Sequence, residues 1–249
     1  MNLIMIHLPR NSKKTYLIII LSTIVVLLFS PCGLCGTKAE FDSFLTPYKN
    51  DIEYSSQILL VATERIFFLE RQIVYPLEKR SGTWQLALKP MKAVIGRNGF
   101  APSGEKREGD GRTPSGIFPL GHSFGYGKSI NTKMPYRQAL EDDIWVDDPD
   151  VSDYNRWTKK GKTHASSYEL MKRDDELYKY GVVIEYNTDP VIKGHGSAIF
   201  FHVWDGAGKT TAGCVAVSED NMIKILEWLD IQEKPLTIIG LDISKRKLF

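Results

Sequence analysis

The fold is decided by residues 197–217, which read SAIFFHVWDGAGKTTAGCVAV. The first part of this stretch is rich in β-branched and aromatic residues, which predicts a buried strand that ends near His202. The glycine-rich part that follows predicts a loop, and the loop leads into a tight turn that contains Gly213 and Cys214. A strand end and a glycine turn are places where an imidazole and a thiol can come within reach of each other.

Short runs of the same kind, separated by turn residues, extend along the rest of the chain. They lie at 58–62, 84–88, 93–95, 116–120, 182–186, 198–203 and 236–239. Helices are expected to be few. We predict one within 38–57 that packs Phe41, Phe44 and Leu45 on the domain, one at 168–178, and one capped by Ser218 with Met222, Ile225, Leu226 and Leu229 on its apolar face. The sequence therefore predicts a mainly β domain with a few helices, in the α+β class.

Length and composition indicate one main domain with an N-terminal leader. A chain of 249 residues, 43% of them hydrophobic, can bury a full core in a single domain. The predicted boundaries are a leader at 1–36, an N-terminal extension at 37–56 and the main domain at 57–249. No internal repeat is evident in the sequence, which excludes repeat architectures.

The leader has the organisation of an export signal. Arg10, Lys13 and Lys14 form a basic start, and an apolar run covers 16–29. Small residues within 30–36 would admit a signal peptidase, whereas an uncleaved leader would serve as an N-terminal membrane anchor. Either alternative places the rest of the chain outside the cytoplasm, in the periplasm or cell envelope.

The charge of the chain argues against nucleic-acid binding. The formal net charge is +2, and the leader holds three basic and no acidic residues, so the remaining chain carries −1. A nearly neutral body lacks the basic surface that tracks a phosphate backbone. No nucleic-acid partner is predicted, and the sequence leaves the oligomeric state open.

Cys214 is the only cysteine beyond the leader. A lone thiol in an exported protein is either reactive or sheltered in the core. With His202 as general base, Cys214 is predicted to be a nucleophile, and the amides of Gly213 and Cys214 to bind a developing oxyanion. An ion pair with His202 should also lower the pKa of the thiol below its free value of about 8.5 and make labelling fast near neutral pH.

Two stretches resemble the L,D-transpeptidase (YkuD-type) catalytic domain family. The segment KGHGSAIFFH at 193–202, followed by TAGC at 211–214, is similar to the histidine-to-cysteine signature of that family. Upstream, KREGDGRTPSGIFPLG at 106–121 resembles the family's Gly-Asp-Gly-x-Thr-Pro-x-Gly segment. The resemblance extends from about Gln57 to Leu241.

The resemblance implies a β-sandwich catalytic domain that acts on the peptide stems of peptidoglycan. In that family a cysteine thiolate attacks the carbonyl next to an L-centre and expels the terminal D-alanine, and an amine of another stem resolves the thioester into a crosslink. Carried over to this sequence, the resemblance makes Cys214 the nucleophile and His202 the general base. The carbonyl of Val203 becomes an orienting partner of the imidazole, and Gly213 with Cys214 the oxyanion site.

Several alternatives stay open. If water resolves the thioester, the enzyme is an L,D-carboxypeptidase. A noncatalytic envelope-binding domain would hold glycan or peptide in an aromatic cleft, although an intact His202 and Cys214 argue against it. A zinc site of His195, His202 and Cys214 would suit a hydrolase, but paired ligand spacings such as His-x-x-x-His are missing beyond the leader. No metal or cofactor is predicted.

Substrate contacts are only partly assigned by the sequence. The candidates are Thr211, His195, Trp204 and Tyr154. Aromatic and polar clusters between 145 and 187 either line a cleft for peptide or sugar or fill a satellite core. The residues after Cys214, Val-Ala-Val, lack the arginine or asparagine that many members of the family carry there.

Overall fold

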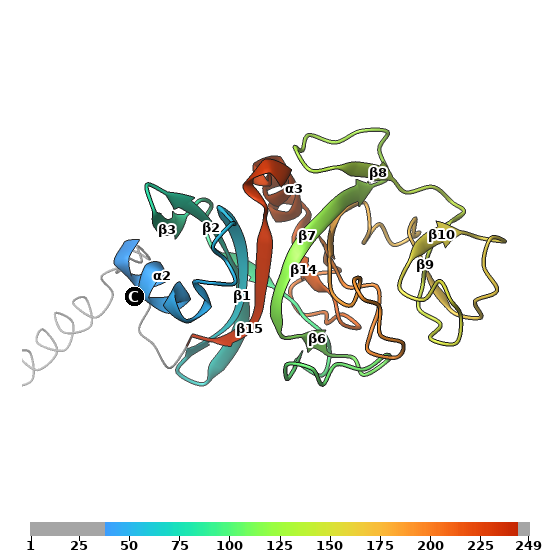
Figure 1. Ribbon diagram of the computed structural model, residues 1–249, viewed down its shortest axis with the longest axis horizontal. Helices are drawn as coiled ribbons and strands as arrows, with labels where there is room; N and C mark the ends of the chain where they lie inside the picture. The colour runs from blue at the N-terminus through green and yellow to red at the C-terminus, as the bar shows by residue number, and fades with distance from the viewer. Residues whose placement is uncertain (1–37, 244–249) are drawn as a thin grey trace, which may run out of the picture. The chain divides into compact units, whose positions relative to one another are not determined.

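The computed structural model describes residues 38–243, so the predicted leader at 1–36 lies outside the described residues. Figure 1 shows a strand-rich domain with the helices α2 (Lys38–Leu45) and α3 (Glu219–Trp228). The prediction of a mainly β domain with few helices is confirmed. No helix within the described part of the chain is long and apolar enough to cross a membrane.

Among residues 38–243, ten strands form the main sheet, in the order β14-β13-β12-β7-β15-β1-β2-β3, with β4 paired to β2 and β8 paired to β7. These strands are β1 (Gln57–Ile66), β2 (Leu69–Arg80), β3 (Thr83–Leu86), β4 (Met91–Ala93), β7 (Gly116–Gly125), β8 (Tyr136–Gln138), β12 (Tyr180–Ile184), β13 (Phe200–Val203), β14 (Val215–Val217) and β15 (Leu236–Asp242). Two small sheets pair β5 (Phe100–Ala101) with β6 (Thr113–Pro114), and β9 (Asp143–Val146) with β10 (Trp157–Lys159) and β11 (Tyr168–Leu170). The 3₁₀ turns η1 (Thr46–Tyr48) and η2 (Ile231–Glu233) complete the elements.

The main sheet curls until its two ends meet. Val94, which follows β4, exchanges two backbone hydrogen bonds of 2.9 Å with Ala216 in β14. Gly96 and Thr211 form a second bridge along this seam. Apolar side chains from both halves of the sheet fill the enclosed core. Because Thr211 belongs to the turn that leads to Cys214, the seam lies beside the predicted nucleophile.

Both predicted helices at the two ends of the domain form where the sequence places them. The apolar face of α3, Met222, Ile225, Leu226 and the following Leu229, is buried in the enclosed core. Helix α2 buries Phe41, Phe44 and Leu45 in a second core on the other face of β1. This alternation follows from the period of two along a strand, since Ile58 and Leu60 join one core and Leu59 the other.

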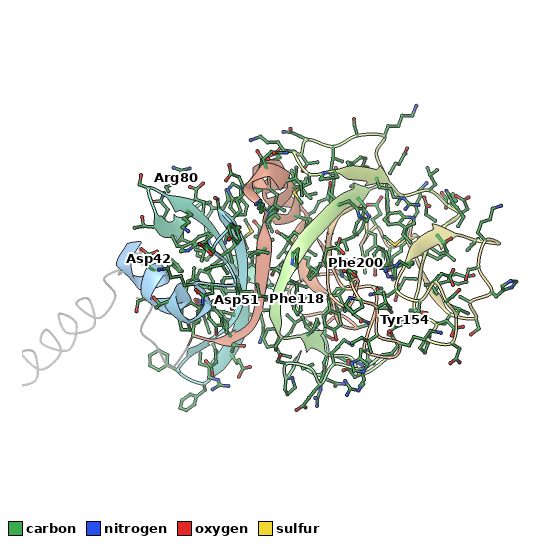
Figure 2. The ribbon with its side chains drawn as sticks, viewed as in Figure 1. Asp42, Asp51, Arg80, Phe118, Tyr154 and Phe200 are labelled. Atoms are coloured by element: carbon green, nitrogen blue, oxygen red, sulfur yellow. The ribbon has the colours of Figure 1, made fainter. Side chains whose placement is uncertain are left out.

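A third core lies on the outer face of β12 and β13, beneath residues 139–178. Its rings pack edge to face, as in Trp145 against Phe200, whose centroids are 5.0 Å apart at 75°. In Figure 2, Phe200 and Tyr154 lie in this half of the domain. The aromatic cluster of the middle region therefore fills a satellite core, and the predicted site residues lie at the edge of that core.

The predicted helix at 168–178 is wrong. Residues 168–170 form β11, which pairs antiparallel with β9 through Tyr168–Val146 and Leu170–Ile144. After it the chain turns, and Arg173 donates to the carboxylate of Asp175 at 2.6 and 2.9 Å. Helix propensity is a weak preference, and the pairing of β11 with β9 in the small three-stranded sheet overrides it here.

The observed strands are offset from the predicted runs at one or both ends, and β2 corresponds to no predicted run. Pro76 interrupts the apolar run of β2, and proline disfavours a strand inside a sheet. Strand β13 begins at Phe200 rather than 198, because Ala198 has a left-handed backbone with φ of 52°. That conformation turns the carbonyl of Ala198 out of the ladder and toward Cys214.

Candidate active site

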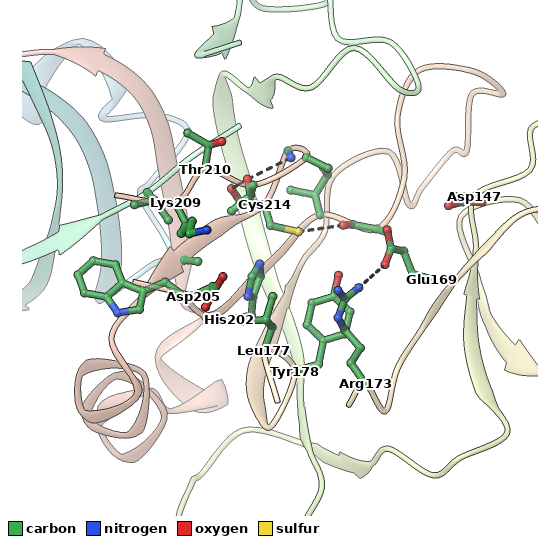
Figure 3. A pocket seen from close by; sticks show the side chains of 18 of the residues that line it. Asp147, Glu169, Arg173, Leu177, Tyr178, His202, Asp205, Lys209, Thr210 and Cys214 are labelled. Atoms are coloured by element: carbon green, nitrogen blue, oxygen red, sulfur yellow. Dashed lines mark hydrogen bonds and ion pairs between the residues drawn. The ribbon is translucent and has the colours of Figure 1, made fainter. Parts of the chain in front are cut away.

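Cys214 and His202 face the same cavity, which has a volume of about 330 Å³. Strands β13 and β14 are parallel, and His202 pairs with Ala216. Cys214 lies two residues before Ala216, so its side chain is on the same face of the sheet as the imidazole. Figure 3 shows the two side chains next to each other, with Glu169 and Arg173 on one side and Asp205 and Lys209 on the other.

The imidazole of His202 is held in one tautomer. Its Nδ1 lies 2.7 Å from the carbonyl oxygen of Val203, and a carbonyl only accepts, so Nδ1 carries the proton. The other ring nitrogen, Nε2, is therefore the basic one. Burial lowers the pKa of His202 to about 4, with the hydrogen bond to Val203 opposing the shift. At neutral pH the ring is uncharged and able to take a proton.

The thiol of Cys214 is buried, and it is hydrogen-bonded to backbone groups of Ala198 and Phe200. Its Sγ donates to the carbonyl of Ala198 at 3.2 Å and accepts from the N–H of Phe200 at 3.4 Å. Burial raises the pKa of the thiol to about 12, and the N–H of Phe200 opposes the shift only partly. The expected ion pair with His202 is therefore absent from the resting protein, because desolvation disfavours both charged forms. The prediction that the pKa of the thiol is lowered is therefore wrong, because burial raises it.

The resting thiol should react slowly with alkylating reagents. With its pKa raised by burial, labelling of Cys214 by iodoacetamide is expected to stay slow at pH 7 and to increase up to at least pH 10, about tenfold for each pH unit. The measurement is the labelling rate of the chain from residue 37 onward between pH 6 and pH 10, with free cysteine as the reference. A plateau reached below pH 8 would show a thiolate at rest and contradict the buried, neutral thiol.

The turn that carries the nucleophile is fixed by two threonines. The hydroxyl of Thr211 donates to the carbonyl of Cys214 at 2.7 Å and accepts from the N–H of Gly213 at 3.1 Å. Thr113 donates to the same carbonyl at 3.4 Å and accepts from the N–H of Gly96 at 2.9 Å. Because Thr211 already occupies the amide of Gly213, an oxyanion bound by that amide would have to displace the hydroxyl.

Four carboxylates line the cavity, and Arg173 and Lys209 line it with them. Asp205 lies on the other side of Cys214 from Glu169 (Figure 3), and the remaining three are Glu108, Asp147 and Glu169. Glu169 forms an ion pair of 3.1 Å with Arg173. Burial raises the pKa of Asp147 and also that of Glu169, whose shift is opposed by Arg173. Within the described residues, Oδ1 of Asp147 is buried without a hydrogen-bond partner. We call these three side chains the acidic wall, and its chemistry suits a cationic or hydrogen-bond-donating group.

The comparison with protein families agrees with this geometry. A family model described as the L,D-transpeptidase catalytic domain (YkuD) matches residues 70–238, which is more than half of the chain. The chain belongs to the L,D-transpeptidase catalytic domain family. None of the curated proteins compared with it matches. Within the matched range, the transpeptidase domain places His202, Gly213 and Cys214 around one cavity.

The other predicted contacts of this transpeptidase domain divide into two groups. Thr211 and Trp204 line the cavity with the thiol. His195 lies in the preceding loop and is not among the residues that line the cavity, so the three zinc candidates His195, His202 and Cys214 do not converge there. Tyr154 is buried behind the cavity, where its hydroxyl donates to Glu108 and accepts from the N–H of Gly196 at 3.0 Å. Tyr154 therefore supports the acidic wall from behind.

The sequence left open that polar clusters between 145 and 187 line a cleft, without singling out Asp147, Glu169 or Arg173, and these three residues do line the cavity. In this region Asp147 follows β9, and Glu169 pairs with Trp145 across β11 and β9. The sequence feature that could have pointed to them is a charged residue at or near a short strand, beside a buried aromatic residue. Many strands with one face in water have the same feature, so it does not identify a site. Only the packing of the insert on β13 brings them to Cys214.

Asn155 joins the insert to the loop that carries Ala198. This buried side chain accepts from Trp145 Nε1 at 2.8 Å and from the N–H of Ala198 at 3.1 Å. Its amide donates to the carbonyls of Tyr186 and Asn187 at 3.2 and 2.7 Å. The hydrogen bonds from Trp145 and Ala198 are buried, so no water can replace them, and those to Tyr186 and Asn187 are partly buried.

The Asn155→Ala variant should be strongly destabilised. Loss of the amide leaves the buried donors of Trp145 and Ala198 unpaired and removes two partly buried hydrogen bonds, so the free energy of unfolding is expected to fall by about 2–4 kcal/mol. Urea unfolding of the chain from residue 37 onward measures it. The matched control is Asn131→Ala, which removes one exposed hydrogen bond to Glu227 and should change stability by less than about 0.5 kcal/mol. Equal effects of the two variants would contradict the bridging role.

Proposed function

We propose that this protein is an exported L,D-transpeptidase that uses Cys214 as its nucleophile on the peptide stems of peptidoglycan. The observation that carries the proposal is the arrangement of Cys214 beside an imidazole whose Nδ1 is bonded to Val203, in a domain of this family. The leader pattern at 1–36 supports export to the periplasm or cell envelope.

Acylation begins when the thiol exchanges its hydrogen bond to Ala198 for one to Nε2 of His202. The Sγ–H proton passes to Nε2 while Sγ bonds to the carbonyl carbon of the donor stem. The resulting oxyanion requires donors from the backbone near Gly213 and Cys214. When the C–N bond breaks, the imidazolium returns the proton to the departing amine, and D-alanine leaves a thioester behind.

The acidic wall supports transfer to an amine over hydrolysis. An acceptor amine is protonated in water at neutral pH, and carboxylates beside the thioester would attract this ammonium group. After the ammonium group has lost one proton to a carboxylate of the wall, the neutral amine attacks the thioester and gives a second proton to His202. The imidazolium passes that proton to Sγ as the C–S bond breaks, so Cys214 leaves as a thiol. Water gains no comparable attraction, so the charge of the cavity favours crosslinking.

Products formed from purified tetrapeptide stems test this function. The chain from residue 37 onward should release D-alanine and form crosslinked dimers, both detected by mass spectrometry. Release of D-alanine without dimers would instead identify an L,D-carboxypeptidase. Inactivity on several stem types, equal to that of Cys214→Ala, would overturn the proposal and favour a noncatalytic binding domain.

Replacing Glu169 by glutamine should change the fate of the thioester. The wall loses a charge that attracts the acceptor, so the ratio of dimers to hydrolysed stems is expected to fall by about fivefold to tenfold, while D-alanine release changes less. Glu141→Gln is the matched control, because Glu141 is 79% exposed and pairs with Lys172 away from the cavity. If the ratio of dimers to hydrolysed stems is unchanged in Glu169→Gln, the acidic wall does not select the acceptor.

A further inference from the structure

The loop at 205–210 borders the catalytic cavity and is anchored at both ends. It reads DGAGKT and joins β13 to the turn that carries the thiol. Just before the loop, the N–H of Trp204 donates to the carbonyl of Val217 at 2.8 Å. Just after it, the N–H of Thr211 donates to the carbonyl of Ile95 at 2.9 Å. The loop therefore starts and ends at fixed positions beside the thiol.

Lys209 extends from this loop into the cavity. Its N–H donates to the carbonyl of Gly206 at 3.1 Å, which closes a turn within the loop. Figure 3 shows the nitrogen end of the Lys209 side chain directed toward Cys214 and His202. The residue is exposed, so its ammonium group is in water until a substrate enters the cavity.

Among residues 38–243, two lysine or arginine side chains line the cavity, Arg173 and Lys209. Arg173 is already paired, because its guanidinium group forms ion pairs with Glu169 at 3.1 Å and with Asp175 at 2.6 Å. Lys209 forms no ion pair with any side chain of the described residues. Of these two cations, Lys209 is the one whose donors are free for an anion of the substrate.

The proposed reaction brings such an anion close to the thiol. The leaving residue of the donor stem is D-alanine, and its carboxyl carbon is three bonds from the carbonyl carbon that Sγ attacks. The lengths of these bonds place the carboxyl carbon within about 4 Å of the attacked carbon. A group that binds this carboxylate must therefore line the same cavity. The four carboxylates of the cavity repel it, so binding requires a cation.

Asp205 lies on the same side of the cavity as Lys209 (Figure 3). Both residues are exposed, and no ion pair joins them in the described part of the chain. An ammonium group has three donors, so Lys209 can bind a substrate carboxylate while Asp205 stays nearby. The charge of Asp205 opposes the binding of an anion, which makes Lys209 the attractive group on this side.

We propose that Lys209 binds the C-terminal carboxylate of the donor stem and thereby selects stems that end in a free carboxyl group. The bond is a charge-assisted hydrogen bond between the ammonium group and the carboxylate. This inference rests on the proposed function, which supplies D-alanine as the leaving residue. The two sides of the cavity then have different tasks. Lys209 receives the carboxylate of the donor, and the acidic wall receives the ammonium group of the acceptor.

Calorimetric titration of the full-length chain with Cys214→Ala tests the site without turnover. The titrants are a tetrapeptide stem with a free C-terminal carboxylate and the same stem with a C-terminal amide. The free acid should bind about tenfold more tightly than the amide. When Lys209→Gln is added, the Kd values of the two stems should agree within about twofold. Lys209→Arg keeps the positive charge and should keep a preference for the free acid.

Lys92→Gln is the matched control for the loss of a lysine. Lys92 is also exposed and forms no ion pair within the described residues. It lines a neighbouring cavity of about 560 Å³ and not the cavity of the thiol, so its replacement should leave the preference for the free acid unchanged. Asp205→Asn removes a charge of the opposite sign from the same loop, and it should maintain or strengthen that preference.

Three results would overturn the proposal. The first is equal binding, or no binding, of the two stems before Lys209 is changed. The second is a preference for the free acid that survives Lys209→Gln. The third is a loss of the preference in Lys92→Gln or Asp205→Asn as large as that in Lys209→Gln. Failure of the proposed function gives a different result, because the wild type would then release no D-alanine from either stem even if it binds the free acid through Lys209.

Discussion

Replacing Cys214 by alanine is expected to abolish release of D-alanine from tetrapeptide stems, with a loss of at least about a thousandfold in rate. No other thiol exists beyond the leader, so no other side chain of this kind can form the thioester. The remaining oxyanion donors and the acidic wall would still bind substrate, so KM should change less than kcat. Quantifying free D-alanine over time for both proteins measures the effect.

The comparison of D-alanine release between Cys214→Ala and the wild type requires that the variant is folded. Alanine removes a small buried side chain with two weak hydrogen bonds to Ala198 and Phe200, so the loss of stability should stay near about 1–2 kcal/mol. Cys214→Ser is the matched control for volume, and its less nucleophilic hydroxyl should also leave the enzyme inactive. A Cys214→Ala protein that releases D-alanine at the wild-type rate would exclude Cys214 as the nucleophile.

Replacing His202 by glutamine is the change with the second largest expected effect. The variant keeps hydrogen-bonding capacity near Val203 but loses the base that takes the thiol proton, so kcat should fall by about a hundredfold to ten thousandfold. Because the thiol rests protonated, the rate of the variant should rise with pH wherever hydroxide can replace the base. The measurement is kcat for D-alanine release between pH 5 and pH 10, and a wild-type profile would contradict the role of His202.

The same histidine should link stability to pH. Its folded pKa, about 4, is lower than the unfolded value of 6.5, so the unfolded chain takes up the proton first as the pH falls. The free energy that the neutral, buried ring contributes is present above pH 6.5 and is lost toward pH 4, up to about 3 kcal/mol. Urea unfolding should therefore show a smaller acid-side decrease in His202→Gln than in the wild type.

Local sequence patterns were sufficient for much of the fold. The β-branched run that ends at His202 formed β13, and the apolar spacing after Ser218 formed α3. The patterns failed at two strands. Strand β2 contains Pro76, although it pairs along its length with β1, the strand directly before it in the chain. Strand β11 has helix-forming residues that pair with β9 instead.

The candidate site was likewise predicted only in part from the sequence. The motif around Cys214 identified the thiol and His202 as candidates because they are close in sequence, with His202 on β13 and Cys214 directly before β14, the strand that pairs with it. The acidic wall depends on an insert that packs on the outer face of the sheet, which no local pattern reports. The direction of the pKa shifts could not be predicted either, because burial of Cys214 and His202 follows from that same packing.

The mass of the intact protein during turnover shows whether Cys214 is the nucleophile. The chain from residue 37 onward is incubated with a tetrapeptide stem in the absence of an acceptor amine and quenched in acid, and the adduct is mapped by proteolysis. We expect an added mass equal to the stem without its D-alanine, on Cys214 of the wild type and on no residue of Cys214→Ala. Release of D-alanine with no adduct on Cys214, at equal rates in both proteins, would contradict it.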